Sequence, residues 1–172
     1  QSIAFTYNGI HQFRFPDIQL QKGENLLVLG ESGIGKTTLI QILAGLLQPN
    51  QGSVELNGTN FQDLSSKNLD LFRGKDIGMV FQRPHFVRNL SILDNLLLSL
   101  FLSKNKQDKK RATQLLEQIG LGNKLDSKPD QLSQGEQQRA SIALAVVKNP
   151  DLIFSAISCG NSKFKRTFQL IK

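Results

Sequence analysis

The sequence of 172 residues contains one cysteine and no tryptophan, and it has no long apolar run. The single cysteine, Cys159, excludes an internal disulfide framework and is typical of a protein from a reducing compartment. A membrane-spanning helix needs roughly 20 apolar residues in succession, whereas the most apolar segment, residues 91–102, is shorter and includes Asp94 and Asn95. The first residues show no basic region followed by an apolar core, so no signal peptide is predicted. These absences predict a soluble protein with a single core.

Excess positive charge is concentrated near the end of the sequence. The whole chain has a net charge of +7, but residues 1–162 contain 17 basic and 14 acidic residues, a net charge of +3. The other basic residues lie in a final stretch without acidic residues, and they are Lys163, Lys165, Arg166 and Lys172. So small a charge over most of the chain does not favour nucleic acid binding, and we expect no nucleic-acid partner.

Hydrophobic patterning predicts an α/β order of elements. The apolar run at 25–30 is typical of a strand buried on both faces, and the segment after it has the apolar spacing of a helix. The middle of the chain, about 84–135, is helical and predicts a lobe inserted into the α/β core. Apolar residues at Ile142, Ala145 and Val146 make the last helix amphipathic. The predicted strands are 3–7, 13–20, 25–30, 76–81 and 151–154, and residues 53–58 are predicted as a short strand followed by a turn at Asn57 and Gly58. The predicted helices are 36–47, 91–103, 109–120 and 135–147.

A glycine-rich loop follows the strand predicted at 25–30. The stretch "GESGIGKTT" matches the phosphate-loop pattern G-x-x-x-x-G-K-[ST] in full. Glycines allow the close approach of backbone N–H groups to phosphate oxygens, the lysine supplies a positive charge, and the threonine hydroxyl can ligate Mg²⁺. A chance glycine turn before a lysine is the alternative, but the strand before the loop and the helix after it disfavour that alternative. The predicted nucleotide-binding residues are Gly30, Ser32, Gly33, Gly35, Lys36, Thr37 and Thr38, with Thr37 as a Mg²⁺ ligand.

A second motif, "LSQGE" at 132–136, stands immediately before a predicted helix and resembles the LSGGQ signature of ATP-binding cassette (ABC) ATPases. Gln134 and Glu136 depart from that signature, whereas Ser133 and Gly135 retain it. The resemblance implies that Ser133 and Gly135 contact the γ-phosphate of ATP held by a partner subunit. The alternative is structural: Ser133 caps the helix, and a glutamate nearby completes the cap.

The resemblance extends over residues 2–155 and implies roles for two further residues. Gln82 matches the Q-loop residue, which implies that it senses the metal and the attacking water and acts as a Mg²⁺ ligand. Tyr7 matches the aromatic residue that stacks on adenine, although a core position explains it equally well.

The resemblance implies an α/β fold: a P-loop NTPase (ABC ATPase) core with an N-terminal antiparallel β subdomain and an inserted helical lobe, C-terminally incomplete. Residues 1–155 would form the ATP-binding domain, and residues 156–172 a basic tail outside the family pattern. The sequence is similar to the bacterial subfamily for lipoprotein release and macrolide export. The implied function is that of a transporter's ATP-binding subunit, with ATP and Mg²⁺ as cofactors.

The implied partners are a transmembrane permease and a second ATPase subunit, identical or paired, at the cytoplasmic face of the inner (plasma) membrane. Two alternatives stay open: a soluble ABC-type ATPase of DNA repair or translation, and a nucleotide-binding module that does not hydrolyse ATP.

The family pattern breaks directly after the strand predicted at 151–154. The positions of the Asp-Glu pair that organises Mg²⁺ and activates water are occupied by Ala156 and Ile157, so no catalytic glutamate is present. Three explanations compete: a degenerate ATPase, a truncated chain, or a change of reading frame near residue 155. The abrupt change to a basic, motif-free stretch favours a change of frame.

Overall fold

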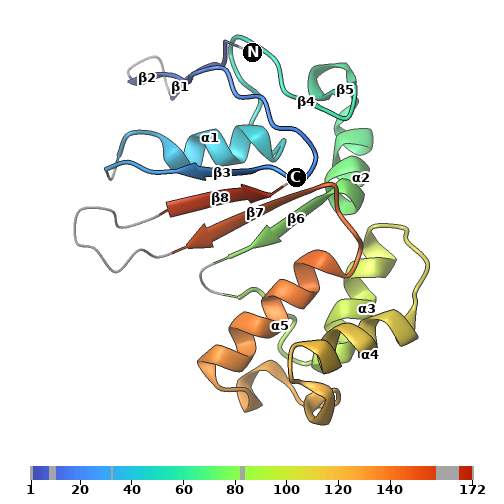
Figure 1. The fold of residues 1–172 in the computed structure, drawn as a ribbon. Helices are drawn as coiled ribbons and strands as arrows, with labels where there is room; N and C mark the ends of the chain where they lie inside the picture. Colours follow the sequence, from blue (N-terminus) through green and yellow to red (C-terminus); the bar gives the residue numbers. More distant parts are fainter. Residues whose placement is uncertain (1, 8–10, 32, 82–83, 158–166, 172) are drawn as a thin grey trace. The chain divides into compact units, whose positions relative to one another are not determined.

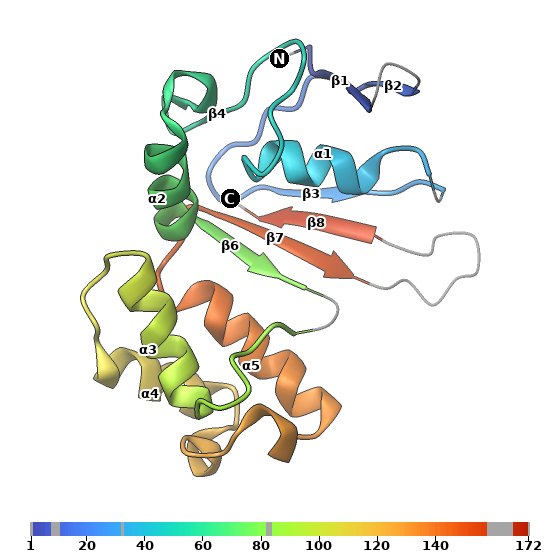
Figure 2. The same cartoon turned by 180° about the vertical axis from the view of Figure 1, so that it is seen from behind.

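The structure is a computed structural model that describes residues 2–7, 11–31, 33–81, 84–157 and 167–171. The chain divides into two compact units. One unit comprises Gln1–Arg73 and Ile157–Lys172, and the other comprises Gly74–Ala156. Figures 1 and 2 show the elements of each unit from opposite sides. In the described part of the chain, no helix is long and apolar enough to cross a membrane.

The first unit begins with an antiparallel hairpin of β1 (Ala4–Tyr7) and β2 (His11–Arg14), in which Tyr7 pairs with His11. This hairpin is the N-terminal antiparallel β element that the sequence predicts. The prediction of a strand over 13–20 is wrong beyond Arg14, where β2 ends. Pro16 follows closely and has no N–H group to donate to a neighbouring strand.

The strand β3 (Asn25–Val28) leads into the glycine-rich loop and is not buried on both faces as predicted. Its side chains alternate in burial, and Leu27 is 53% exposed. Successive side chains of a strand point to opposite faces, so this alternation means that one face is covered and the other is open. A strand that was not predicted, β8 (Thr167–Ile171), pairs antiparallel with β3 and forms hydrogen bonds with the backbone groups along one edge of β3.

Helix α1 (Lys36–Leu43) starts where predicted but ends four residues earlier than the expected 47. Gly45 has a φ of 68°, and the Leu46 N–H donates back to the Gln41 carbonyl oxygen at 2.7 Å. A glycine in the left-handed region after the last turn is the usual helix terminator, and it stops α1 here.

Short elements complete the first unit. The strands β4 (Glu55–Leu56) and β5 (Thr59–Asn60) are joined by Asn57 and Gly58, whose φ values of 51° and 78° are typical of a tight hairpin turn. They are followed by the 3-10 turn η1 (Phe61–Asp63) and by α2 (Ser66–Asp76), a helix that was not predicted.

The described part of the second unit includes a parallel strand pair and the helices of the lobe. Strand β6 (Ile77–Val80) pairs in parallel with β7 (Leu152–Ile157), as an α/β fold requires. The helices are α3 (Ile92–Leu102), α4 (Lys109–Gln118) and α5 (Gln134–Val146), with the 3-10 turns η2 (Gly122–Lys124) and η3 (Pro129–Gln131) between the last two. Helices α3 and α4 lie within the lobe predicted over about 84–135, and α5, which packs against both, is the further helix predicted at 135–147.

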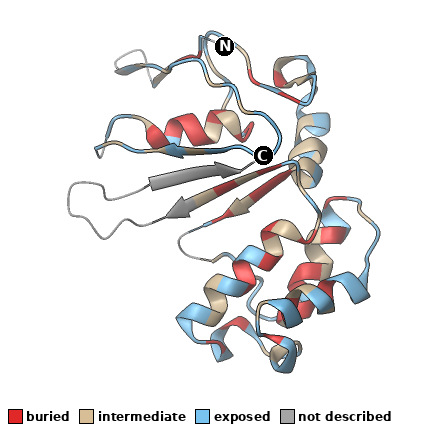
Figure 3. Cartoon of the chain, viewed as in Figure 1, coloured by how far each residue is buried: buried red, intermediate tan, exposed pale blue. Residues whose placement is uncertain are grey.

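The core of the lobe lies among the three helices and appears in red in Figure 3. Ile142, predicted on the apolar face of the last helix, is 43% exposed, whereas Ala140 and Ala143 of α5 are buried in this core. The buried cluster consists of Ile92, Leu93, Leu96, Leu100, Ala112, Leu116, Leu121, Leu132, Ala140, Ala143 and Val147.

Candidate functional site

The glycine-rich loop leaves the first turn of α1 open to an anion. Gly33 and Gly35 have φ values of 91° and 93°, a conformation that glycine adopts without strain. Gly35 is the N-cap of α1, provides no side-chain acceptor, and is followed by no acidic residue in the first turn. The first N–H groups of a helix have no partner within the helix, so those of α1 are available to phosphate oxygens.

Lys36 is buried in this loop, with only 8% of its surface exposed. Its ammonium group donates to the carbonyl oxygen of Gly30 at 2.6 Å and to that of Glu31. The lysine therefore lies folded back inside the loop, with its charge held at the point where a phosphate group would enter. This contact satisfies a buried cation that would otherwise be costly to bury.

The β1–β2 hairpin packs against the loop. A Cβ atom at Gly35 would lie only 2.5 Å from a ring carbon of Phe13, so the ring of Phe13 closely covers this glycine. The Tyr7 hydroxyl is 3.4 Å from the Oγ1 of Thr38, which is buried at the start of α1. The Tyr7 ring packs edge-on against Phe5 and Phe13 yet is 43% exposed. It is therefore both a packing residue and an accessible aromatic surface beside the loop.

The structure thus gathers most of the predicted nucleotide-binding residues at the start of α1. Tyr7, Gly35, Lys36 and Thr38 meet there, and Thr37 is exposed on the first turn. Ser32 lies outside the described residues. The contact of Phe13 with the loop was not predicted, because strand alternation alone does not reveal the partner of a strand.

Ser133 and Gly135 lie in the second unit, at the start of α5. Ser133 is the N-cap, and its hydroxyl accepts the Glu136 N–H at 3.3 Å while the Glu136 carboxylate accepts the Ser133 N–H at 2.8 Å. The Glu136 carboxylate is stabilised by hydrogen bonds from Ser133, first from its backbone N–H and then from its side chain, and they lower the pKa of Glu136. The capping alternative is therefore correct as a description of this chain, and the contact with a partner's ATP stays a prediction.

The residues expected to support catalysis are only partly described. Gln82 lies outside the described residues. Ala156 and Ile157 form the end of β7, at the carboxyl edge where the family's acidic pair would stand. Among the described residues, no group of three or more His, Cys, Asp or Glu side chains could hold a metal ion. Thr37 is thus the one predicted Mg²⁺ ligand that the structure describes.

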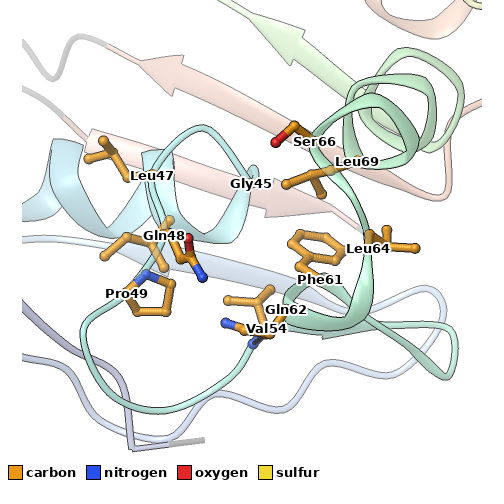
Figure 4. A pocket seen from close by; sticks show the side chains of 11 residues that line it. Gly45, Leu47, Gln48, Pro49, Val54, Phe61, Gln62, Leu64, Ser66 and Leu69 are labelled. Carbon is orange, nitrogen blue, oxygen red and sulfur yellow. Dashed lines mark hydrogen bonds between the residues drawn. The ribbon is translucent and has the colours of Figure 1, made fainter.

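A small cavity at the other end of α1 is separate from this site (Figure 4). It has a volume of about 100 Å³ and is lined by side chains that include Ile42, Phe61 and Leu69. Sites for small molecules usually measure about 300 Å³ or more, so this cavity cannot hold a nucleotide.

Comparison with known proteins agrees with this geometry. The profile of the ABC transporter family matches residues 14–155. An uncharacterised ABC transporter ATP-binding protein of Methanocaldococcus jannaschii is 39% identical and aligns with 84% of this chain and 66% of its own length. The lipoprotein-releasing system ATP-binding protein LolD of Shewanella denitrificans is 40% identical, with 84% of this chain and 63% of LolD covered. LolD of Bacteroides thetaiotaomicron is 33% identical, with 90% and 72% covered.

Solved structures give the same result. The dimeric bacterial ABC transporter cassette MJ0796 superposes with a TM-score of 0.68 at 30% identity, covering 87% of this chain and 69% of the cassette. A structure of MJ0796 in a post-hydrolysis state, bound to ADP and Pi, superposes equally well. This chain spans about two thirds of the length of the first two curated relatives, 66% and 63%. The chain belongs to the ABC transporter family.

Proposed function

We propose that this chain is the ATP-binding subunit of an ABC transporter. The observation that carries the proposal is the loop before α1, in which glycines, an uncapped helix start and the buried Lys36 ammonium converge. Polyphosphate oxygens would accept the N–H groups of α1 and replace the loop carbonyls as partners of Lys36. The exposed face of Tyr7 would stack on the adenine ring.

The assembly we propose is the one that the family uses. A second ATPase subunit would close on the bound ATP through Ser133 and Gly135, and a membrane permease would hold the pair at the cytoplasmic face of the inner membrane. The similarity to LolD proteins supports lipoprotein release or a related export process, and it gives no support to a role in DNA repair or translation.

Hydrolysis by this chain would be slow. Mg²⁺ bound with ATP would neutralise phosphate charge, and Thr37 and Gln82 can contribute ligands to it. No carboxylate stands at positions 156 and 157 to complete the metal shell or to activate water. The chain would therefore bind ATP and remain loaded, and it would depend on another subunit for turnover.

Binding of a fluorescent ATP analogue tests the proposal. Replacing a charged donor to phosphate costs about 1.5–3 kcal/mol, so Lys36→Met should weaken binding by about ten-fold or more. Lys22→Met is the matched control, because Lys22 is an exposed lysine in a turn outside the loop. Equal affinity of the two variants would refute the proposed site. Steady-state phosphate release at the rate of an intact family member would refute only the statement on hydrolysis.

A further inference from the structure

The connection between α3 and α4 exposes two large apolar side chains next to each other. Phe101 and Leu102, at the end of α3, are 61% and 67% exposed, the highest values among the large hydrophobic residues described. The buried stripe of α3 ends at Leu100, which is 3% exposed, so neither residue is needed for the core of the lobe. Two adjacent exposed apolar side chains at the end of a helix, which the core does not need, make this surface a candidate for contact with something apolar.

Basic residues follow this apolar pair in the sequence. Residues 101–111 contain five basic residues and one acidic residue, a net charge of +4. The one acid, Asp108, is the N-cap of α4 and accepts the Arg111 N–H at 2.9 Å. In the described part of the chain, no ion pair involves the four lysines of this segment, and all of them are exposed: Lys104, Lys106, Lys109 and Lys110.

Hydrogen bonds give the connection a defined shape. The Ser103 hydroxyl donates to the carbonyl oxygens of Ser99 at 2.8 Å and Leu100 at 3.0 Å, and the Asn105 N–H donates to Leu100 at 2.9 Å. Both ribbon views show the connection at the outer edge of α3 and α4 (Figures 1 and 2). The backbone that carries the apolar pair and the first lysines is therefore held in place before binding, so less of it needs to be ordered on binding.

We propose that residues 101–110 bind directly to the surface of membranes that contain anionic phospholipids. Phe101 and Leu102 would enter the headgroup region, and the lysines would lie against lipid phosphates. Lysine is depleted in protein–protein interfaces, where arginine is preferred, and four of the five basic residues here are lysines. The proposed permease would bring the chain to a membrane. The connection would add a direct lipid contact that requires neither permease nor nucleotide.

Co-sedimentation of the full chain with vesicles tests this inference. Vesicles of phosphatidylcholine with phosphatidylglycerol should bind the chain, pure phosphatidylcholine vesicles should not, and added salt should weaken the binding. Each lysine near an anionic surface contributes a factor of about five. The variant K104Q/K106Q/K109Q/K110Q should therefore lose binding by well over ten-fold, and F101S/L102S should lose about ten-fold.

Matched controls separate this surface from general charge and hydrophobicity. The variant K163Q/K165Q/R166Q/K172Q has the same net charge as the lysine variant of the connection, and L46S/I142S removes two other exposed apolar residues. Both controls should bind vesicles as the wild type does. Binding of the fluorescent ATP analogue should be unchanged in every variant of the connection, so failure here is distinguishable from failure of the proposed function.

Three outcomes would overturn the inference. The first is no binding of the wild type to anionic vesicles. The second is loss of binding only when the basic residues after 162 are changed, which would assign the lipid contact to that stretch. The third is binding of a DNA duplex that depends on the four lysines without binding of vesicles, which would assign the connection to nucleic acid.

Discussion

Gly33 and Gly35 have almost the same backbone conformation, but replacing each with alanine should lower the free energy of unfolding by different amounts. An L-residue in the left-handed region costs about 1–2 kcal/mol, and the φ values are 91° at Gly33 and 93° at Gly35. A Cβ at Gly33 would meet no atom within 4 Å, whereas one at Gly35 would lie 2.5 Å from the Phe13 ring. We expect Gly33→Ala to lower the free energy of unfolding by about 1 kcal/mol and Gly35→Ala by about 2–4 kcal/mol.

Urea denaturation of both variants, followed by circular dichroism, measures this difference. The variant F13L provides the control, because a smaller side chain at position 13 gives the new methyl group room. In the F13L background, Gly35→Ala should cost nearly the same as Gly33→Ala, a coupling of about 1 kcal/mol or more between positions 13 and 35. Equal costs for the two alanine variants in the wild-type background would refute the contact between the hairpin and the loop.

Four further measurements follow from the structure. Ser133→Ala removes the cap of α5 and should lower the free energy of unfolding by about 1 kcal/mol, which urea denaturation would detect. Asn95 is 4% exposed, and its side chain accepts the Val87 N–H and donates to the Val87 carbonyl oxygen. Asn95→Leu should therefore lower the free energy of unfolding by about 2 kcal/mol or more in the same assay, and an unchanged free energy would contradict these hydrogen bonds. Burial lowers the pKa of Lys148 to about 8, although the nearby charge of Asp76 acts in the opposite direction. Between pH 8 and the ordinary lysine pKa of 10.5, the unfolded chain therefore binds more protons than the folded chain. The free energy of unfolding should therefore rise over this range in the wild type and rise less in Lys148→Met, as urea titrations at several pH values would show. Reading the coding DNA beyond codon 155 in the other two frames should reveal an Asp-Glu-Pro run, and its absence from both would exclude a change of frame.

The elements that the sequence predicted well are those with strong local signals. The loop from Gly30 to Thr37 is marked by its glycines and lysine, and the start of α1 follows from it. The turn at Asn57 and Gly58 and the cap at Ser133 also depend on neighbours in the chain alone. Such features need no knowledge of tertiary packing.

The features that were missed depend on distant partners. The apolar run at 25–30 does not reveal that one face of β3 is open, and the basic stretch at the end does not reveal that Thr167–Ile171 pairs with that strand. Helix α2 has few apolar residues and none that is buried, so no hydrophobic period marks it. The contact between Phe13 and Gly35 joins residues that are far apart in sequence, and periodicity carries no information about it.

The position of Lys36 affects which anions can bind in the loop. Its ammonium group has already exchanged water for two carbonyl oxygens, so a ligand competes with the protein itself for this cation. A small anion with a single charge gains little by replacing these two carbonyl oxygens. A polyphosphate chain offers several charged oxygens at once and can also accept the N–H groups of α1. We therefore expect the folded-back lysine to discriminate between polyphosphates and simple salt anions before any contact with a nucleotide base is made.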